Sequence, residues 1–198
     1  MNRLAVLIPA AGAARRMGGG DKLTEDVGGE PALRRAARLA SELGAQVIVT
    51  LPAASERLSA RRAALAGLQV RCLEIADWRE GMAASLRAGA AAAEGAQGLM
   101  VLLPDMPGIE PADLAALFAA FLAAPDRPLR ATTPDGAPGH PVILPARLLP
   151  AMETLTGDRG AAGLLATEAA RLVVLAGDRA IRDLDTPEDW ARWRATRG

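Results

Sequence analysis

The sequence predicts an α/β fold, a three-layer α/β/α sandwich around a mostly parallel, Rossmann-like sheet. Short apolar runs of strand length alternate with segments of helical periodicity along most of the chain. Several of these runs are apolar at every position, which is typical of strands buried on both faces of a parallel sheet. The first run leads directly into a glycine-rich loop, as in many nucleotide-binding α/β folds. With 198 residues, we expect a single domain over residues 1–198.

The first strand is expected over Leu4–Ile8, and the loop after it combines glycines with cations. Glycines let backbone amides approach a ligand closely, and the cations favour an anionic one. A triphosphate fits both properties, although a strand-to-helix turn that happens to be basic is the alternative. The loop contains neither a G-K-[S/T] triplet nor a G-x-G-x-x-G motif. Its glycines and cations are Gly12, Gly18, Gly19, Gly20, Arg15, Arg16 and Lys22.

Helices and strands then alternate through the first half of the chain. A helix begins at Pro31, where the missing N–H costs nothing, and closes at Gly44. The following elements are a strand over Val47–Leu51, a helix over Ser55–Ala66, a strand over Val70–Ile75 and a helix over Met82–Glu94. The arginines of the Ser55–Ala66 helix, Arg57, Arg61 and Arg62, are expected on its solvated face.

The second half begins with a buried strand over Leu99–Leu103 that ends at Pro104 and Asp105. This places the Asp105 carboxylate at the carboxyl edge of the sheet, where open α/β folds bind ligands. The helix from Pro111 is expected to bury the stripe Leu114, Leu117, Phe118, Phe121 and Leu122. Residues 127–144 are expected to form a substrate-facing insertion that contains a short strand near Leu129–Thr132 and a polar turn at Pro134–Gly136. The last elements are helices over Arg147–Leu155 and Gly160–Ala170, a strand over Leu172–Leu175, and a helix capped at Thr186 and docked by Trp190 and Trp193.

Composition limits the classes of function. Lysine plus arginine equals aspartate plus glutamate at 23 each, and only 3% of residues are aromatic, so we expect no nucleic-acid partner. The single cysteine, Cys72, excludes an intrachain disulfide and a thiolate metal cluster. No apolar stretch approaches the roughly 20 residues that span a bilayer, and no signal-peptide pattern is present. We therefore expect a cytoplasmic protein without a membrane partner.

Six blocks of the sequence resemble one family. The loop P-A-A-G-x-x-x-R-M-G-G-x-D-K at Pro9–Lys22 is similar to the signature loop of the molybdenum cofactor nucleotidyltransferases. The other blocks follow in the family's order: G-M-A-A-S-L-R-A-G at Gly81–Gly89, L-P-D-M-P at Leu103–Pro107, G-H-P-V at Gly139–Val142, G-D-R-G-A at Gly157–Ala161 and D-L-D-T-P-E-D at Asp183–Asp189. Together they resemble the cytidylyltransferase branch, while the spacing of R-M-G-G-G-D-K resembles the guanylyltransferase loop.

The resemblance implies a sheet of the nucleotide-diphospho-sugar transferase (GT-A-like) type. It also implies transfer of CMP from CTP to the phosphate of a molybdopterin-type cofactor, with release of pyrophosphate and with Mg²⁺ as the cofactor. The resemblance favours CTP over GTP, because Ala10-Ala11-Gly12 is similar to the A-A-G form of the cytidylyl branch, and the Ala11 methyl group would occupy space that a purine needs. The alternatives are a GTP-dependent molybdenum cofactor guanylyltransferase, a sugar-phosphate nucleotidyltransferase and a non-enzymatic nucleotide-sensing module.

The nucleotide side of the site is expected to use the loop. Lys22 would provide a fixed positive charge that stabilises the negative charge developing on the oxygens of the reacting phosphate. Arg16 would bind the β- and γ-phosphates through a bidentate fork, a role that Arg15 could share. Ser85 would meet the base or ribose, with helix capping or core packing as the alternative. The expected nucleotide-binding residues are Ala10, Ala11, Gly12, Arg15, Arg16, Gly18, Lys22 and Ser85, and the expected catalytic residues are Lys22 and Arg16.

The metal and the acceptor are expected to use later blocks. Asp105 is the expected Mg²⁺ ligand, since this ion favours carboxylate oxygens, and a turn or capping role is the alternative. The resemblance implies Asp185 as the second ligand, with Asp183 as the other possibility. A phosphate nucleophile is already ionised near neutral pH, so a substrate contact is expected of His140 rather than a role as base. The expected acceptor-binding residues are His140, Asp158 and Arg159.

Overall fold

The computed structural model describes residues 4–157, 161, 164–165 and 168–196. Within them, a seven-stranded sheet has the strand order β3-β2-β1-β4-β6-β5-β7. Only β6 runs antiparallel to its neighbours β4 and β5 among these strands, so the predicted mostly parallel sheet is confirmed. The strands are β1 (Ala5–Pro9), β2 (Gln46–Pro52), β3 (Arg71–Ile75), β4 (Gly98–Val101), β5 (Leu129–Thr132), β6 (Pro138–Pro145) and β7 (Arg171–Val174).

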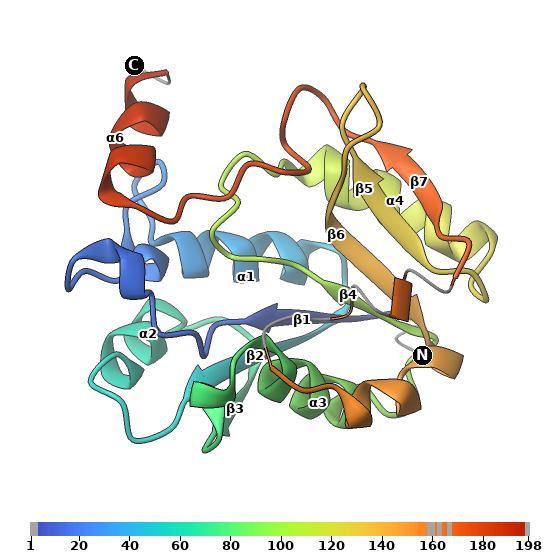
Figure 1. The fold of residues 1–198 in the computed structure, drawn as a ribbon, viewed down its shortest axis with the longest axis horizontal. Coiled ribbons are helices and arrows are strands. Elements are labelled where there is room, and N and C mark those ends of the chain that lie inside the picture. Colours follow the sequence, from blue (N-terminus) through green and yellow to red (C-terminus); the bar gives the residue numbers. More distant parts are fainter. Residues whose placement is uncertain (1–3, 158–160, 162–163, 166–167, 197–198) are drawn as a thin grey trace.

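Helices cover both faces of this sheet (Figure 1), which confirms the three-layer sandwich. Helices α1 (Ala32–Glu42), α2 (Leu58–Ala64) and α4 (Pro111–Ala123) pack on one face, and α3 (Met82–Ala92) packs on the other. Side chains of β1 alternate between the two cores, with Val6 and Ile8 on the α1 side and Ala5 and Leu7 on the α3 side. Every side chain of β1 is buried, which agrees with its entirely apolar sequence.

The C-terminal helix α6 (Pro187–Ala195) begins at a capping box. Thr186 accepts a hydrogen bond from the Asp189 amide, and the Asp189 carboxylate accepts one from the Thr186 amide. Trp190 and Trp193 are buried and pack edge to face, with ring centroids 6.1 Å apart. The predicted cap and docking face are therefore confirmed. None of the described helices combines the length and the apolar character that crossing a membrane requires.

Three expectations about the second half are wrong. Residues 129–145 are not an insertion but supply β5 and β6 of the main sheet, because Val142 to Leu144 are buried on both faces. The segment expected as one helix over 147–155 forms two 3-10 helices, η4 (Ala146–Leu148) and η5 (Pro150–Thr154), since Pro150 cannot donate to continue a helix. Leu122 is 37% exposed rather than part of the buried stripe. The helix expected over 160–170 lies mostly outside the described residues.

Candidate active site

The glycine-rich loop leaves β1 at the carboxyl edge of the sheet and is built from short turns. Three loop residues have positive φ values: 47° at Ala14, 58° at Gly18 and 101° at Gly19. A positive φ is readily reached by glycine, which explains why Gly18 and Gly19 occur here. The loop ends in a 3-10 turn, η2 (Lys22–Thr24), in which the Asp21 carboxylate accepts a hydrogen bond from the Leu23 amide.

Lys22 lies between two carboxylates that are distant in sequence. Its Nζ is 2.5 Å from an Asp105 oxygen and 2.5 Å from an Asp185 oxygen, and its side chain is 19% exposed. Burial alone would lower the pKa of Lys22, but the charges and hydrogen bonds of Asp105 and Asp185 outweigh this effect and raise the pKa. Lys22 is therefore a fixed cation at neutral pH, as expected.

Two contacts bring Asp105 and Asp185 together across the sequence. The Leu184 amide donates to the Asp105 carbonyl at 2.9 Å, which ties the segment before α6 to the end of β4. On the other side, Trp190 and Trp193 pack in one apolar cluster with Leu184 and with Met17 of the loop. The docking of α6 thus sets the position of Asp185 beside Lys22.

Asp183 completes an acidic cluster with Asp105 and Asp185. One oxygen of each carboxylate lies within 4.8 Å of the others. Burial and the charges of Asp105 and Asp185 raise the pKa of Asp183, with burial the larger cause. Asp105 Oδ1 is buried and has no hydrogen-bond partner among the described residues. Three converging carboxylates and an unpaired ligand atom fit a hard divalent cation.

The two loop arginines differ in the structure, although sequence reasoning could not separate them. Arg16 forms an ion pair with Asp185, and its side chain is 73% exposed. Arg15 is also exposed and has no ion pair with another described residue. Arg16 therefore belongs to the cluster with Lys22, whereas no ion pair joins Arg15 to the part of the chain that the structure describes.

His140 lies on β6, next to the end of β4, because Val142 pairs with Val101. Burial, followed by the nearby Arg130 charge, lowers the pKa of His140, and Asp105 and the Val101 carbonyl oppose this only partly. The imidazole is therefore neutral at neutral pH. Its Nδ1 is buried without a hydrogen-bond partner among the described residues, so a polar atom remains for a ligand.

The remaining nucleotide-side residues are less accessible than expected. Ala10 is fully buried, its amide donates to the Thr50 carbonyl at 3.0 Å, and its carbonyl accepts from Arg61. Ala11 is 2% exposed and Ser85 is 3% exposed. Gly12 and Gly18 are exposed. In this structure, the loop offers a ligand its glycines and cations more than its alanines. Asp158 and Arg159 lie outside the described residues.

Arg61, which contacts the glycine-rich loop, is a residue whose environment the sequence does not predict. It was expected on the solvated face of its helix, but it is fully buried and pairs with Asp21. The helical pattern places Arg61 among other arginines and contains no sign that the glycine-rich loop lies against it. The expectation is wrong because the loop, rather than water, covers this part of α2.

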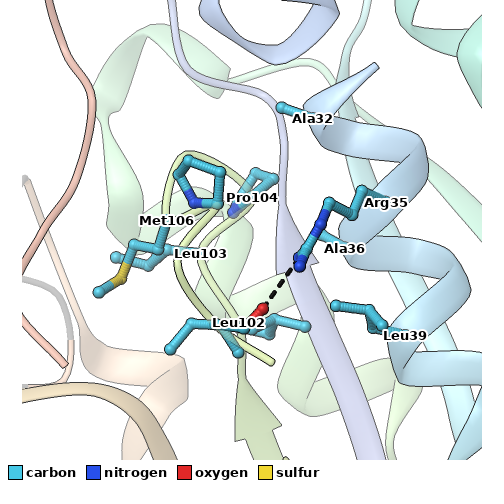
Figure 2. A pocket seen from close by; sticks show the side chains of 10 residues that line it. Ala32, Arg35, Ala36, Leu39, Leu102, Leu103, Pro104 and Met106 are labelled. Carbon is cyan, nitrogen blue, oxygen red and sulfur yellow. Dashed lines mark hydrogen bonds between the residues drawn. The ribbon is translucent and has the colours of Figure 1, made fainter. Parts of the chain in front are cut away.

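A small apolar pocket lies behind the segment that carries Asp105 (Figure 2). Its walls are α1, through Ala32, Arg35, Ala36 and Leu39, and residues 102–109 after β4. Arg35 donates to the Ile109 carbonyl at 2.9 Å and so holds this segment against α1. None of the three residues of the acidic cluster lines this pocket, so the pocket is separate from the candidate active site.

Comparison with known proteins adds the family. Residues 6–174 match the model of the MobA-like NTP transferase domain. Nicotine blue oxidoreductase of Paenarthrobacter nicotinovorans is 29% identical over 192 residues, which cover 92% of each chain. The crystal structure of Rv0371c from Mycobacterium tuberculosis H37Rv is 28% identical, covers 97% of each chain and has a TM-score of 0.80. A manganese complex of the same protein is 25% identical, with a TM-score of 0.78 and coverage of 96% of this chain and 97% of that one.

Proposed function

The chain belongs to the MobA-like NTP transferase family, and we propose that it transfers CMP from CTP to the phosphate of a molybdopterin-type cofactor, with release of pyrophosphate. The observation that carries the proposal is the position of Lys22 between Asp105 and Asp185, directly after a glycine-rich loop. A fixed cation, metal-binding carboxylates and a loop that approaches phosphates are the groups that nucleotidyl transfer requires. CTP, the molybdopterin-type acceptor and Mg²⁺ are the specific parts of this proposal.

In the proposed reaction, an acceptor phosphate oxygen attacks the α-phosphorus in line. A new P–O bond forms to the acceptor, the bond to the bridging oxygen breaks, and pyrophosphate leaves with that electron pair. Lys22 exchanges its carboxylate partners for phosphate oxygens and stabilises the charge that develops on them. Arg16, with Arg15 beside it, binds the β- and γ-phosphates and holds the leaving group. The protein need not supply a base, since the acceptor phosphate is already ionised.

Asp105 and Asp185, with Asp183 beside them, are the residues that would hold Mg²⁺. When bound, this ion would neutralise negative charge on the triphosphate. The manganese complex of the mycobacterial relative supports a divalent cation in a protein of similar fold. His140 would contact the acceptor through its unpaired ring nitrogen. Asp158 and Arg159 are proposed for the acceptor from the sequence alone.

The alternatives make different demands on this site. A guanylyltransferase would use the same charges with GTP, and a sugar-phosphate nucleotidyltransferase would use them with another acceptor. A nucleotide-sensing module would bind without turnover and would not need a metal ligand beside Lys22. The name of the Paenarthrobacter relative adds a redox reaction, for which the cluster of Lys22 with acidic residues has no evident use.

Pyrophosphate release tests the proposal. The purified protein is incubated with Mg²⁺, one of CTP, GTP, ATP or UTP, and either molybdopterin or a sugar phosphate. Release that requires both CTP and molybdopterin is expected. Release with GTP or with a sugar phosphate would select the corresponding alternative. Nucleotide binding without release under any combination would favour the sensing module, and reduction of nicotine blue by a hydride donor would favour the redox reaction.

A further inference from the structure

The Arg61 guanidinium connects the two ends of the glycine-rich loop. Its Nη1 donates to the Ala10 carbonyl at 2.7 Å and to the Gly12 carbonyl at 2.9 Å, where the chain leaves β1. Its Nε and Nη2 donate to the two Asp21 oxygens at 2.7 and 2.9 Å, where the loop ends. One planar group, with 0% side-chain exposure, therefore makes four hydrogen bonds across residues 10–21.

Apart from the packing of Met17 in the cluster of Trp190 and Trp193 and the ion pair of Arg16 with Asp185, the loop has few hydrogen bonds of its own. Among its described backbone bonds, the Met17 amide donates to the Ala14 carbonyl and the Gly20 amide donates to the Met17 carbonyl, so both close single turns. Several residues have positive φ, and glycines lose more conformational freedom than other residues when they are ordered. A link between the loop's ends reduces the shapes that its middle can adopt.

Asp21 passes this restraint on to Lys22. The same carboxylate that Arg61 binds also accepts from the Leu23 amide at 3.2 Å and begins the turn η2. Lys22, the next residue along, therefore leaves the backbone at a position that Arg61 determines. A displaced cation loses much of its effect on a reacting phosphate, since errors of about 1 Å can cost about a hundredfold in rate.

We propose that Arg61, acting with Asp21, is a positioning residue that shapes the glycine-rich loop for a nucleoside triphosphate and aims Lys22 at it. Buried ion pairs contribute little net stability compared with apolar residues of the same size, so this one is better explained by the conformation that it selects. Arginine is required because lysine lacks the fork that reaches Asp21 and both carbonyls at once. The inference rests on the proposed nucleotidyl transfer but predicts a property of the loop that can be measured without it.

The test uses two mild variants and a matched control in the full chain. Arg61→Lys keeps the charge beside Asp21 and removes the fork, while Asp21→Asn keeps the size and removes the charge. If either variant does not fold, the other still decides the question. Arg62→Lys is the control, because Arg62 is the next residue on α2 but is 57% exposed and pairs with Glu74 instead of the loop.

Amide hydrogen exchange measures the shape of the loop directly, without substrate. In Arg61→Lys and Asp21→Asn, peptides that cover residues 10–24 should exchange at least about tenfold faster, and the strands of the sheet should exchange as in the wild type. Arg62→Lys should match the wild type everywhere. Unchanged exchange in the loop, or equally faster exchange along the whole chain, would overturn the proposal, since the first shows no restraint and the second a general loss of stability.

Turnover per folded molecule links the loop to the reaction. Both variants should lower the rate of pyrophosphate release at saturating nucleotide by at least about tenfold, with the folded fraction measured by circular dichroism. Normal turnover in a variant whose loop exchanges faster would show that the restraint has no role in positioning. If the wild type releases no pyrophosphate, the proposed function fails, whereas hydrogen exchange and nucleotide affinity still decide whether Arg61 shapes a nucleotide-binding loop.

Discussion

The positive charge of Lys22 and the negative charges of the carboxylates around it offset one another. Two of the three clustered carboxylates are bonded to Lys22, and Arg16 pairs with Asp185. If these carboxylates hold a divalent cation, as proposed, the cation and Lys22 compete for the charge of the same two side chains, Asp105 and Asp185. Binding of the metal would release Lys22 and Arg16, which could then bind the triphosphate, so metal and nucleotide should favour each other's binding.

Replacing Lys22 should separate these two roles. We expect Lys22→Ala to bind Mn²⁺ about tenfold more tightly without nucleotide, because a competing charge is removed. The same variant should lose more in turnover than in nucleotide binding, since the Lys22 interaction strengthens in the transition state. Electron paramagnetic resonance of free Mn²⁺ gives the first value, and steady-state kinetics give the second. Lys22→Arg, which keeps the charge, serves as the control for metal affinity. Weaker binding of Mn²⁺ to Lys22→Ala would contradict the competition.

At the residue level, the sequence predicts the charged groups near the carboxyl ends of strands. It does not predict the buried residues that pair with them. Asp105 was predictable because it follows a buried strand at the edge where ligands bind, and Lys22 because it ends the glycine-rich loop that leaves β1 at the same edge. Arg61 was not, because its partner Asp21 lies 40 residues away and the helical pattern only marks Arg61 as polar. The pairing of Asp185 with Arg16 also depends on how α6 docks, which the local sequence does not encode.

At the level of elements, β6 is the strand that places His140 near Asp105. It runs against β4, so the residues before Val142 extend beyond the end of β4 toward the ligand edge of the sheet. Its direction could not be predicted, since the Gly-His-Pro sequence is typical of a turn and periodicity does not distinguish parallel from antiparallel strands. The strands β1, β2 and β4 were predicted because they are central and consist mostly of apolar residues.

Gly139 is a position on β6 that leaves no room for a side chain. A Cβ there would lie 1.8 Å from the Ala180 carbonyl oxygen, which also accepts the His140 amide at 2.7 Å. We expect Gly139→Ala to lower the free energy of unfolding by about 2 to 3 kcal/mol, as in other overpacked sites. Chemical denaturation measures this change. Gly108→Ala is the control, because its Cβ would meet its nearest neighbour, Arg179 Cγ, at 3.8 Å. Equal stability of the two variants would show that β6 can move away from Ala180.

For the whole molecule, we propose that the choice between CTP and GTP depends on how closely α3, β3 and the loop pack. Ala11 is buried in an apolar cluster with Ile75, Trp78 and Ala84. Its methyl group therefore fills space between the loop, β3 and α3. By holding these three apart at a fixed distance, the methyl group would exclude a purine. A single methyl group gives only about 1 to 3 kcal/mol of discrimination, so hydrogen bonds to the base must supply the rest.

Competition between CTP and GTP at equal concentration tests this choice. The wild type should use CTP preferentially, and Ala11→Gly should reduce the preference by about tenfold. Product analysis by chromatography gives the ratio of the two nucleotides incorporated. Ala13→Gly is a useful comparison, since Ala13 is only partly buried beside the same cluster. Preferential use of GTP by the wild type would assign the protein to guanylyl transfer and remove the role proposed for Ala11.

The arrangement of the whole sheet brings together the loop, Asp105 and the acidic segment before α6. Asp105 contacts both of the others, through Lys22 and through Leu184. Asp105→Asn preserves the size of the side chain and removes its charge, so the fold should persist. Pyrophosphate release at limiting Mg²⁺ should fall by at least about tenfold relative to the wild type. Asp126→Asn, before β5 at the opposite edge of the sheet, should leave the rate unchanged. Release by Asp105→Asn at a near-normal rate would contradict a nucleotidyl-transfer site built on Lys22 and this carboxylate.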